Sequence, residues 1–310
     1  MKINSSTLEA LRKSFSLIFQ QGYGSVEPWS RQLSVRVPSG GKSNVYGWLQ
    51  AMPIMREWVG DRQIQNIAES AFEITNKDYE LTIGVDRNDI EDDNLGVYGP
   101  MLQGLGEADA KNDDYLIVSL LQNGNTALCS DGQYFFDTDH PVSQFDSSLG
   151  TQQNYWSSGK ALTLDNYVAV RAAMMGFLGE NNKPLGVMPD LLVVPPQLGH
   201  IARQITMSDL IVNTAGATPA AGAAGMRNVM AGTARVLEVP ELAGAATTWY
   251  LLATNRTMKP FVVQERRASD FMYLGPGSEH GQKSKKYLFG VDKRGAAGYG
   301  LWFQAAKCVA

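Results

Sequence analysis

The stretch from Tyr46 to Asp93 decides the fold, and it includes Tyr46-Gly47-Trp48-Leu49, Arg56–Arg62 (REWVGDR) and Gly84–Asp93 (GVDRNDIEDD). Between these segments, Ala71–Thr75 and Tyr79–Ile83 alternate apolar and polar residues, a pattern typical of half-buried strands. The intervening Asn76-Lys77-Asp78 has turn composition, so the pattern predicts a hairpin. A two-stranded hairpin is marginally stable on its own in water. It therefore needs another part of the chain, or another chain, to lie on.

Composition places the chain among ordinary globular proteins. Of 310 residues, 44% are hydrophobic and 19% are charged, which excludes a disordered or fibrous protein. The net charge of -4 argues against a dedicated nucleic-acid binder, whose surface should be basic. Two cysteines, Cys129 and Cys308, are too few for a disulfide framework and suit a reducing cytoplasm. We expect no signal peptide and no membrane span, because charges interrupt the hydrophobic residues.

Charge is unevenly distributed along the chain. Residues 76–93 contain seven acidic side chains and two basic ones, whereas residues 255–310 contain ten basic and four acidic. Two interpretations stay open. These are ordinary solvated faces, or they are regions of opposite sign that steer copies of the chain together.

The first third of the chain predicts two helices joined by extended segments. Apolar residues at helical spacing follow Ser5-Ser6-Thr7 as far as Phe19, and Gly22 and Gly24 are expected to end that helix. An extended arm follows to about Ser43. A long helix is predicted over Pro100–Gln122. Its expected buried face is Met101, Leu105, Ala108, Leu116 and Leu120, and its expected polar face is Asp109, Lys111, Asp113 and Asp114.

A second α/β unit is predicted from about Thr163 onward, after a polar surface loop at 144–160. Helices are expected over 163–178 and 196–206, on either side of a buried strand at 190–196. Further strands are expected at 234–239, 249–253, 261–264 and 298–306. The Ala- and Gly-rich segment Asn213–Met226 is interpreted as a loop.

The run Asp131–Pro141 is the strongest candidate for chemistry. Asp131, Asp137, Asp139 and His140 offer oxygen and imidazole donors that could bind a metal. They match no known ligand spacing, however, and the Asp-Gly and His-Pro pairs are common in turns, so a structural loop is the competing interpretation. No serine or cysteine stands in a nucleophile setting, and no phosphate-binding glycine loop follows a strand.

Aromatic and charged residues gather near the predicted hairpin. Tyr46, Trp48 and Trp58, together with Arg56 and Arg62, could stack on the bases of single-stranded nucleic acid. The same residue types are enriched at protein–protein contacts, and the neighbouring acidic run favours that second interpretation. We therefore predict a subunit interface that consists of Trp48, Arg56, Trp58, Asp61 and Arg62.

Several motifs in fixed order carry a resemblance to a known family. They are Tyr46–Leu49, Arg56–Arg62, Gly84–Asp93 and Asp131–Pro141 (DGQYFFDTDHP). Together they resemble the major head subunit (gpT) family of Mu-like phages and prophages, over essentially the whole chain. The resemblance implies an α+β tailed-phage major capsid fold of the Hong Kong 97 type. The implied parts are an N-terminal arm (1–44), an extended loop (45–83), a peripheral domain with a spine helix (84–130), an axial domain (131–290) and a return strand of the peripheral domain (291–310).

The resemblance also implies a function. The chain would be a structural protein, not an enzyme, and would assemble into hexamers and pentamers of an icosahedral virion shell in the bacterial host cytoplasm. The implied partners are copies of itself, a separate scaffold and protease, a portal, decoration proteins and packaged double-stranded DNA without sequence-specific contact. No cofactor, metal or membrane is expected. The alternative is a metal-dependent hydrolase that uses Asp137, Asp139 and His140. The residues that cross-link some relatives cannot be matched here.

Overall fold

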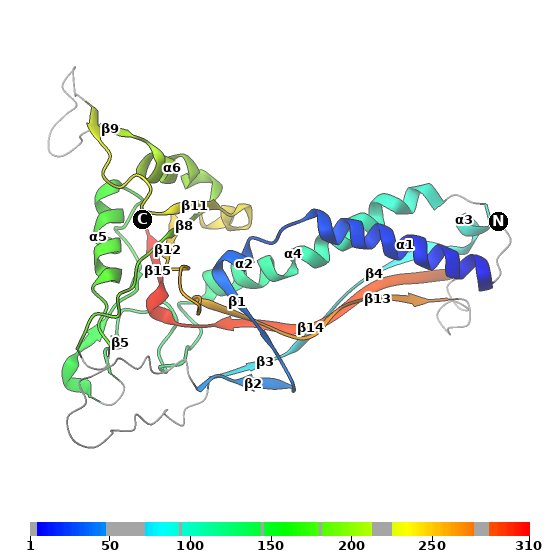
Figure 1. Cartoon of the computed structure of the whole chain (residues 1–310), viewed down its shortest axis with the longest axis horizontal. Helices are drawn as coiled ribbons and strands as arrows, with labels where there is room; N and C mark the ends of the chain where they lie inside the picture. Colours follow the sequence, from blue (N-terminus) through cyan, green and yellow to red (C-terminus); the bar gives the residue numbers. More distant parts are fainter. Residues whose placement is uncertain are drawn as a thin grey trace.

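Two β-sheets joined by one long helix organise the chain (Figure 1). The computed structural model describes residues 5–47, 72–92, 95–143, 146–179, 182–212, 225–275 and 285–310. A four-stranded sheet has the order β1-β13-β14-β4 and forms, with α1 and α4, the elongated first part of the molecule (Figure 1). A five-stranded sheet, β11-β8-β12-β15-β7, lies at the other end of α4 with α5 and α6 (Figure 1).

This first part is built mainly from the first and last thirds of the chain. In the four-stranded sheet β1 is parallel to β13, and the other neighbouring strands are antiparallel. The elements of this part are α1 (Ser5–Ser25), α2 (Ser30–Leu33), β1 (Ser34–Pro38), β2 (Ser43–Val45), β3 (Glu73–Thr75), β4 (Lys77–Asp86), α3 (Arg87–Glu91), η2 (Leu95–Tyr98), α4 (Gly99–Asn123), β13 (Phe261–Leu274) and β14 (Lys286–Tyr299).

The second part holds the larger core. Buried side chains of the five-stranded sheet pack with the C-terminal half of α4. Its elements are β5 (His140–Pro141), η3 (Ser147–Leu149), β6 (Thr151–Gln152), β7 (Tyr155–Trp156), α5 (Leu164–Met175), β8 (Leu191–Val194), η4 (Pro196–Leu198), α6 (Gly199–Met207), β9 (Leu210–Val212), β10 (Gly225–Arg227), β11 (Arg235–Glu238), η5 (Pro240–Ala245), β12 (Thr248–Leu252), η6 (Trp302–Gln304) and β15 (Ala305–Val309).

The predicted hairpin is wrong, although both of its strands exist. β3 pairs with β2, whereas β4 pairs with β14 over ten residues, from Lys77↔Gly295 to Asp86↔Lys286. Only Asn76 separates β3 from β4, which leaves no room for a turn. Asn76 is buried, and its side chain donates hydrogen bonds to Ser39 Oγ and Gly41 O. The long partner strand β14 thus decides the pairing of β4, and local turn composition does not.

Charges of opposite sign meet within this sheet. β4 carries much of the acidic run, and its neighbour β14 carries part of the basic region. Arg294 Nε lies 3.7 Å from Asp78 Oδ1 across the two strands. The uneven charge along the sequence is therefore partly balanced inside one chain.

The first helix continues through the glycines expected to end it. α1 runs from Ser5 to Ser25 and packs beside α4 (Figure 1). A Cβ at Gly22 would lie 2.2 Å from Gln103 O, and a Cβ at Gly106 would lie 2.2 Å from Phe19 O. Gly22 and Gly106 are therefore needed because the two helix backbones approach closely, whereas Gly24 meets nothing within 4 Å and lies in the last turn of α1.

The long helix is confirmed, but its buried face differs from the prediction. α4 has 25 residues and is about 37 Å long. Met101 is exposed, whereas Asp109, Asp113 and Asp114 are buried. Lys293 Nζ lies 3.3 Å from Asp109 Oδ1, and Arg36 pairs with Asp113. Asp109 and Asp113 can face the sheet because cations from β14 and β1 neutralise them, and Asp114 accepts the Ser30 N–H at 2.9 Å.

The expected last strand is also wrong. Residues 298–306 cover the end of β14, the short helix η6 and the beginning of β15. β15 lies in the five-stranded sheet between β12 and β7. The boundaries drawn at residues 83/84 and 290/291 fall inside β4 and β14. Within the described residues, no helix is long and apolar enough to cross a membrane.

Candidate functional site

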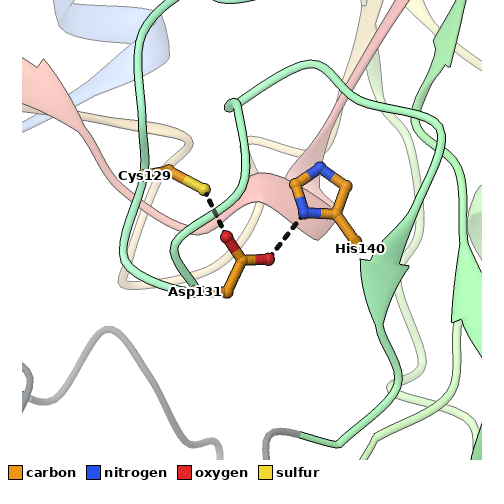
Figure 2. Close-up of side chains that lie close together, drawn as sticks. All are labelled: Cys129, Asp131 and His140. Atoms are coloured by element: carbon orange, nitrogen blue, oxygen red, sulfur yellow. Dashed lines mark hydrogen bonds and ion pairs between the residues drawn. The ribbon is translucent and has the colours of Figure 1, made fainter. Parts of the chain in front are cut away.

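The run that offered metal-binding side chains folds into a loop between α4 and β7. His140 has no exposed surface and belongs to β5. The carboxylate of Asp137 binds within its own loop, where it accepts hydrogen bonds from the N–H groups of Tyr134 and Thr138. Asp139 is exposed, and the nearby charge of Asp137 raises its pKa. Among the described residues, the side chains whose possible ligand atoms lie within 4.8 Å of one another and of His140 are instead Asp131 and Cys129 (Figure 2).

Asp131 lies between Cys129 and His140 (Figure 2). Cys129 Sγ donates to Asp131 Oδ1 at 2.9 Å, and Asp131 Oδ2 lies 2.6 Å from His140 Nδ1. Burial would raise the pKa of Asp131, but hydrogen bonds from His140, Cys129 and the Gln133 N–H outweigh it and lower that pKa. Burial raises the pKa of the Cys129 thiol, which therefore keeps its proton and is no nucleophile.

The geometry of this cluster is that of a hydrogen-bonded network. In a zinc site, a thiolate, a carboxylate oxygen and an imidazole nitrogen all lie about 2.0–2.3 Å from one central ion. Here the carboxylate occupies the central position, and each of its oxygens serves a different neighbour. A metal would have to displace two protons and break both hydrogen bonds. The hydrolase alternative is not supported, because Asp137 and Asp139 do not join His140 in a ligand set.

Asn154 connects this cluster to other segments of the chain. It is fully buried, and its Nδ2 donates to Phe135 O and to Trp302 O. Its Oδ1 accepts the Asp137 N–H and lies 3.2 Å from His140 Nε2. The His140 ring stacks on Trp302 with centroids 3.9 Å apart and planes 2° from parallel. The loop after α4 is therefore joined to η6, the segment between β14 and β15.

The C-terminal end of α4 is capped by side chains from three strands. Its last carbonyls have no partners within the helix. Tyr299 Oη donates to Leu120 O, Tyr250 Oη to Leu121 O, and Lys307 Nζ to Gln122 O at 3.0 Å. Burial raises the pKa of both tyrosines, so they keep the protons they donate. Burial lowers the pKa of Lys307 to about 8. This cap joins the helix to β14, β12 and β15.

An apolar patch lies at the far end of the second part. Met207, Leu210 and Val229 are 64%, 64% and 75% exposed, the largest values for large hydrophobic side chains in the described part of the chain. Met207 ends α6, Leu210 begins β9, and Val229 follows β10 by two residues; β9 lies at one extremity of the molecule (Figure 1). An open hollow of about 670 Å³ lies there, lined by residues that include Asp209 and Arg227. Sequence patterns did not indicate this patch, because its residues are separated along the chain.

The predicted subunit interface lies outside the described residues. Trp48, Arg56, Trp58, Asp61 and Arg62 all fall between positions 48 and 71. Cys129 and Asn154, which complete the His140 network, had no signal in the sequence beyond their nearness to Asp131–Pro141.

Comparison with known proteins identifies the family. The sequence model of the Mu-like prophage major head subunit gpT matches residues 8–157, 145–242 and 228–309. The chain is 29% identical to the major capsid protein of Escherichia phage Mu, over 98% of this chain and 74% of that protein. It is 27% identical to the Mu-like prophage FluMu major head subunit of Haemophilus influenzae, over 98% of this chain and 73% of that protein.

A solved structure agrees with the sequence relatives. The subunit in the procapsid of bacteriophage JBD30 is 30% identical and superposes with a TM-score of 0.59, over 99% of this chain and 76% of that one. The fold is thus the tailed-phage major capsid fold of the Hong Kong 97 type, as the resemblance implied. The chain belongs to the Mu-like prophage major head subunit gpT family and is a structural capsid protein, not an enzyme.

Proposed function

We propose that this head subunit assembles into hexamers and pentamers through a contact at the β9–β10 end of the molecule. The observation that carries the proposal is the exposed patch of Met207, Leu210 and Val229. Exposed apolar patches on soluble proteins mark interaction sites. A closed ring of identical chains needs heterologous contacts, in which two different surfaces meet. Asp209 and Arg227 carry opposite charges beside the patch, so Asp209 of one copy can pair with Arg227 of the next copy around the ring.

The remaining parts of the capsid role follow from the resemblance. Residues 48–71 provide a second subunit contact through Trp48, Arg56, Trp58, Asp61 and Arg62, because aromatic and arginine side chains dominate protein–protein contacts. The shell encloses double-stranded DNA without reading its sequence, consistent with a net charge of -4. Assembly takes place in the host cytoplasm with a separate scaffold and protease, a portal and decoration proteins as partners.

Introducing a charge into the apolar patch tests the proposal. Leu210→Glu places a charge in the proposed contact, while Leu17→Glu changes an equally apolar side chain that is 60% exposed on α1. Both variants should melt like the wild type. With a Mu-like scaffold protein present, electron microscopy should show particles for the wild type and Leu17→Glu and none for Leu210→Glu. Normal particles of Leu210→Glu, or loss of particles with Leu17→Glu as well, would contradict the assignment of the contact to this patch.

A further inference from the structure

Helix α5 has apolar side chains on both its inner and its outer face. The inner face consists of side chains buried in the larger core, namely Tyr167, Val170 and Met174. The outer face consists of exposed side chains, namely Val168, Ala169, Ala172, Ala173 and Met175. A helix that is apolar all round is ordinarily buried on every side, whereas a surface helix carries polar residues outward. The outer face of α5 therefore has the composition of a covered surface.

Helix α6, in the same part of the molecule, shows the ordinary arrangement (Figure 1). It buries Ala202 and Ile205 in the same core as the inner face of α5. Its exposed side chains are polar, and they are His200, Arg203 and Gln204. The outer face of α6 is therefore suited to water, and that of α5 is not.

The apolar surface continues beyond α5. Arg171 Nη1 donates to Pro189 O at 3.5 Å, so the segment before β8 lies beside the helix. Met188 in this segment is 45% exposed. On the helix itself, Val168 and Met175 are 39% and 40% exposed. Three large apolar side chains thus surround the exposed alanines of the outer face.

We propose that a second copy of the chain covers the outer face of α5 in the shell. The inference rests on the ring contact proposed at β9–β10 and extends that contact along the helix. α5 lies at the same outer edge of the second part as β9, on the left in Figure 1, so one neighbouring copy can cover both surfaces. A specific interface takes about 800 Å² and about 20–30 residues on each partner. Met207, Leu210 and Val229 supply a small share of that area, and α5 supplies more.

The composition of the outer face fits a partner that packs closely. Asp165, in the first turn, is the charged residue among the exposed residues of α5, so little charge has to leave water. Ala172 lies four residues after Val168 and three before Met175, which makes the three side chains neighbours on one face. Methionine adapts to differently shaped surroundings, as a contact shared by hexamers and pentamers requires. Because the chain is a structural capsid protein, the protein that each subunit meets throughout the shell is another copy of itself.

Cysteine labelling measures whether the face is covered. The two natural cysteines are buried, so a thiol introduced by Ala172→Cys is the exposed one. We expect a maleimide to label it at least about tenfold more slowly in particles, assembled with a Mu-like scaffold protein, than in free subunits, because the core of an interface is packed like a protein interior. His200→Cys should react equally in both states. Equal reaction of Ala172→Cys in both states, or the same protection of His200→Cys, would overturn the proposal.

A photo-crosslinker shows which protein covers the face. Subunits that carry a benzophenone on Ala172→Cys are assembled with an excess of the unlabelled wild type and then irradiated. We expect conjugates of two head subunits. Conjugates with the scaffold protein alone, or no conjugate at all, would overturn the assignment of a second copy to this face.

Ala172→Glu separates this inference from the contact proposed at β9–β10. The substituted position is exposed, so the variant should melt like the wild type, as should the control His200→Glu. We expect electron microscopy to show no particles for Ala172→Glu and normal particles for His200→Glu. Normal particles of Ala172→Glu together with none of Leu210→Glu would refute the cover of α5 and leave the β9–β10 contact standing. The converse result would refute the β9–β10 contact and support the contact at α5.

Discussion

Asn154 shows how much one buried side chain can hold together. It donates two hydrogen bonds and accepts one backbone N–H without any exposed surface. Asn154→Ala leaves Phe135 O and the Asp137 N–H without their side-chain partner, each at about 1–3 kcal/mol, whereas Trp302 O keeps the N–H of Ala305. We therefore expect a loss of at least about 2 kcal/mol in the free energy of unfolding.

The matched control is Asn166→Ala. Asn166 donates one exposed side-chain hydrogen bond, to Ala161 O, and its loss should cost no more than about 1 kcal/mol. Urea unfolding followed by circular dichroism measures both variants. Equal midpoints for the two would show that the Asn154 network contributes nothing special to stability.

Lys307 gives a pH dependence with a defined sign. Burial lowers its pKa to about 8, from an ordinary value of 10.5. Between these pH values the unfolded chain binds a proton that the folded chain lacks, so stability should rise with pH. A difference of about 2.5 between the two pKa values corresponds to about 3 kcal/mol at most.

Lys307→Met isolates this effect, because tyrosine ionisation affects the variant and the wild type alike. We expect the difference in unfolding free energy between the wild type and Lys307→Met to move in favour of the wild type as the pH rises from about 8 to about 10.5. Parallel pH profiles, measured by denaturant unfolding, would disprove the linkage.

The residues of the hydrogen-bond network around His140 could be predicted only in part. His140 and Asp131 stand in a run whose composition draws attention, and both belong to the network. The sequence groups Asp137 and Asp139 with them only because they are near along the chain. Cys129 and Asn154 are brought to His140 by the path of the loop, which no local pattern encodes.

At the scale of elements, the contact between α1 and α4 depends on glycine. Gly106→Ala would place Cβ 2.2 Å from Phe19 O and 2.6 Å from Tyr23 N, both of them backbone atoms. The helices must move apart, which should destabilise the fold by about 1–3 kcal/mol. Thermal melting followed by circular dichroism measures the change.

Gly104→Ala is the control within the same helix. A Cβ there meets nothing within 4 Å, so the better helix propensity of alanine should stabilise the fold by up to about 1 kcal/mol. Opposite shifts of the melting temperature are therefore expected for the two variants. A stabilising effect of Gly106→Ala would show that the backbones do not approach as closely as described.

The existence of α4 was predictable, whereas its orientation was not. Helical spacing and a proline at the first turn place the helix correctly. Its buried face includes Asp109 and Asp113, whose cationic partners Lys293 and Arg36 lie far away in sequence. The strand β14 could not be predicted, because its small residues Gly295, Ala296 and Gly298 give no alternating pattern. These residues suit strand pairing because β3, β4 and β13 pack around them.

At the scale of the whole molecule, the chain has two parts of different shape. The elongated first part, which has a core cluster of its own, extends from the larger core of the second part (Figure 1). The patch of Met207, Leu210 and Val229 lies at the opposite extremity. Membership of the head subunit family could be recognised from ordered motifs, but the patch became visible only in the fold.

Electron microscopy of the purified chain, produced with a Mu-like scaffold protein, tests the central claim most directly. We expect closed shells, or rings of five and six subunits, with light scattering to confirm their mass. A monodisperse monomer at every protein and salt concentration, despite the scaffold, would contradict the assignment of this chain as a self-assembling head subunit.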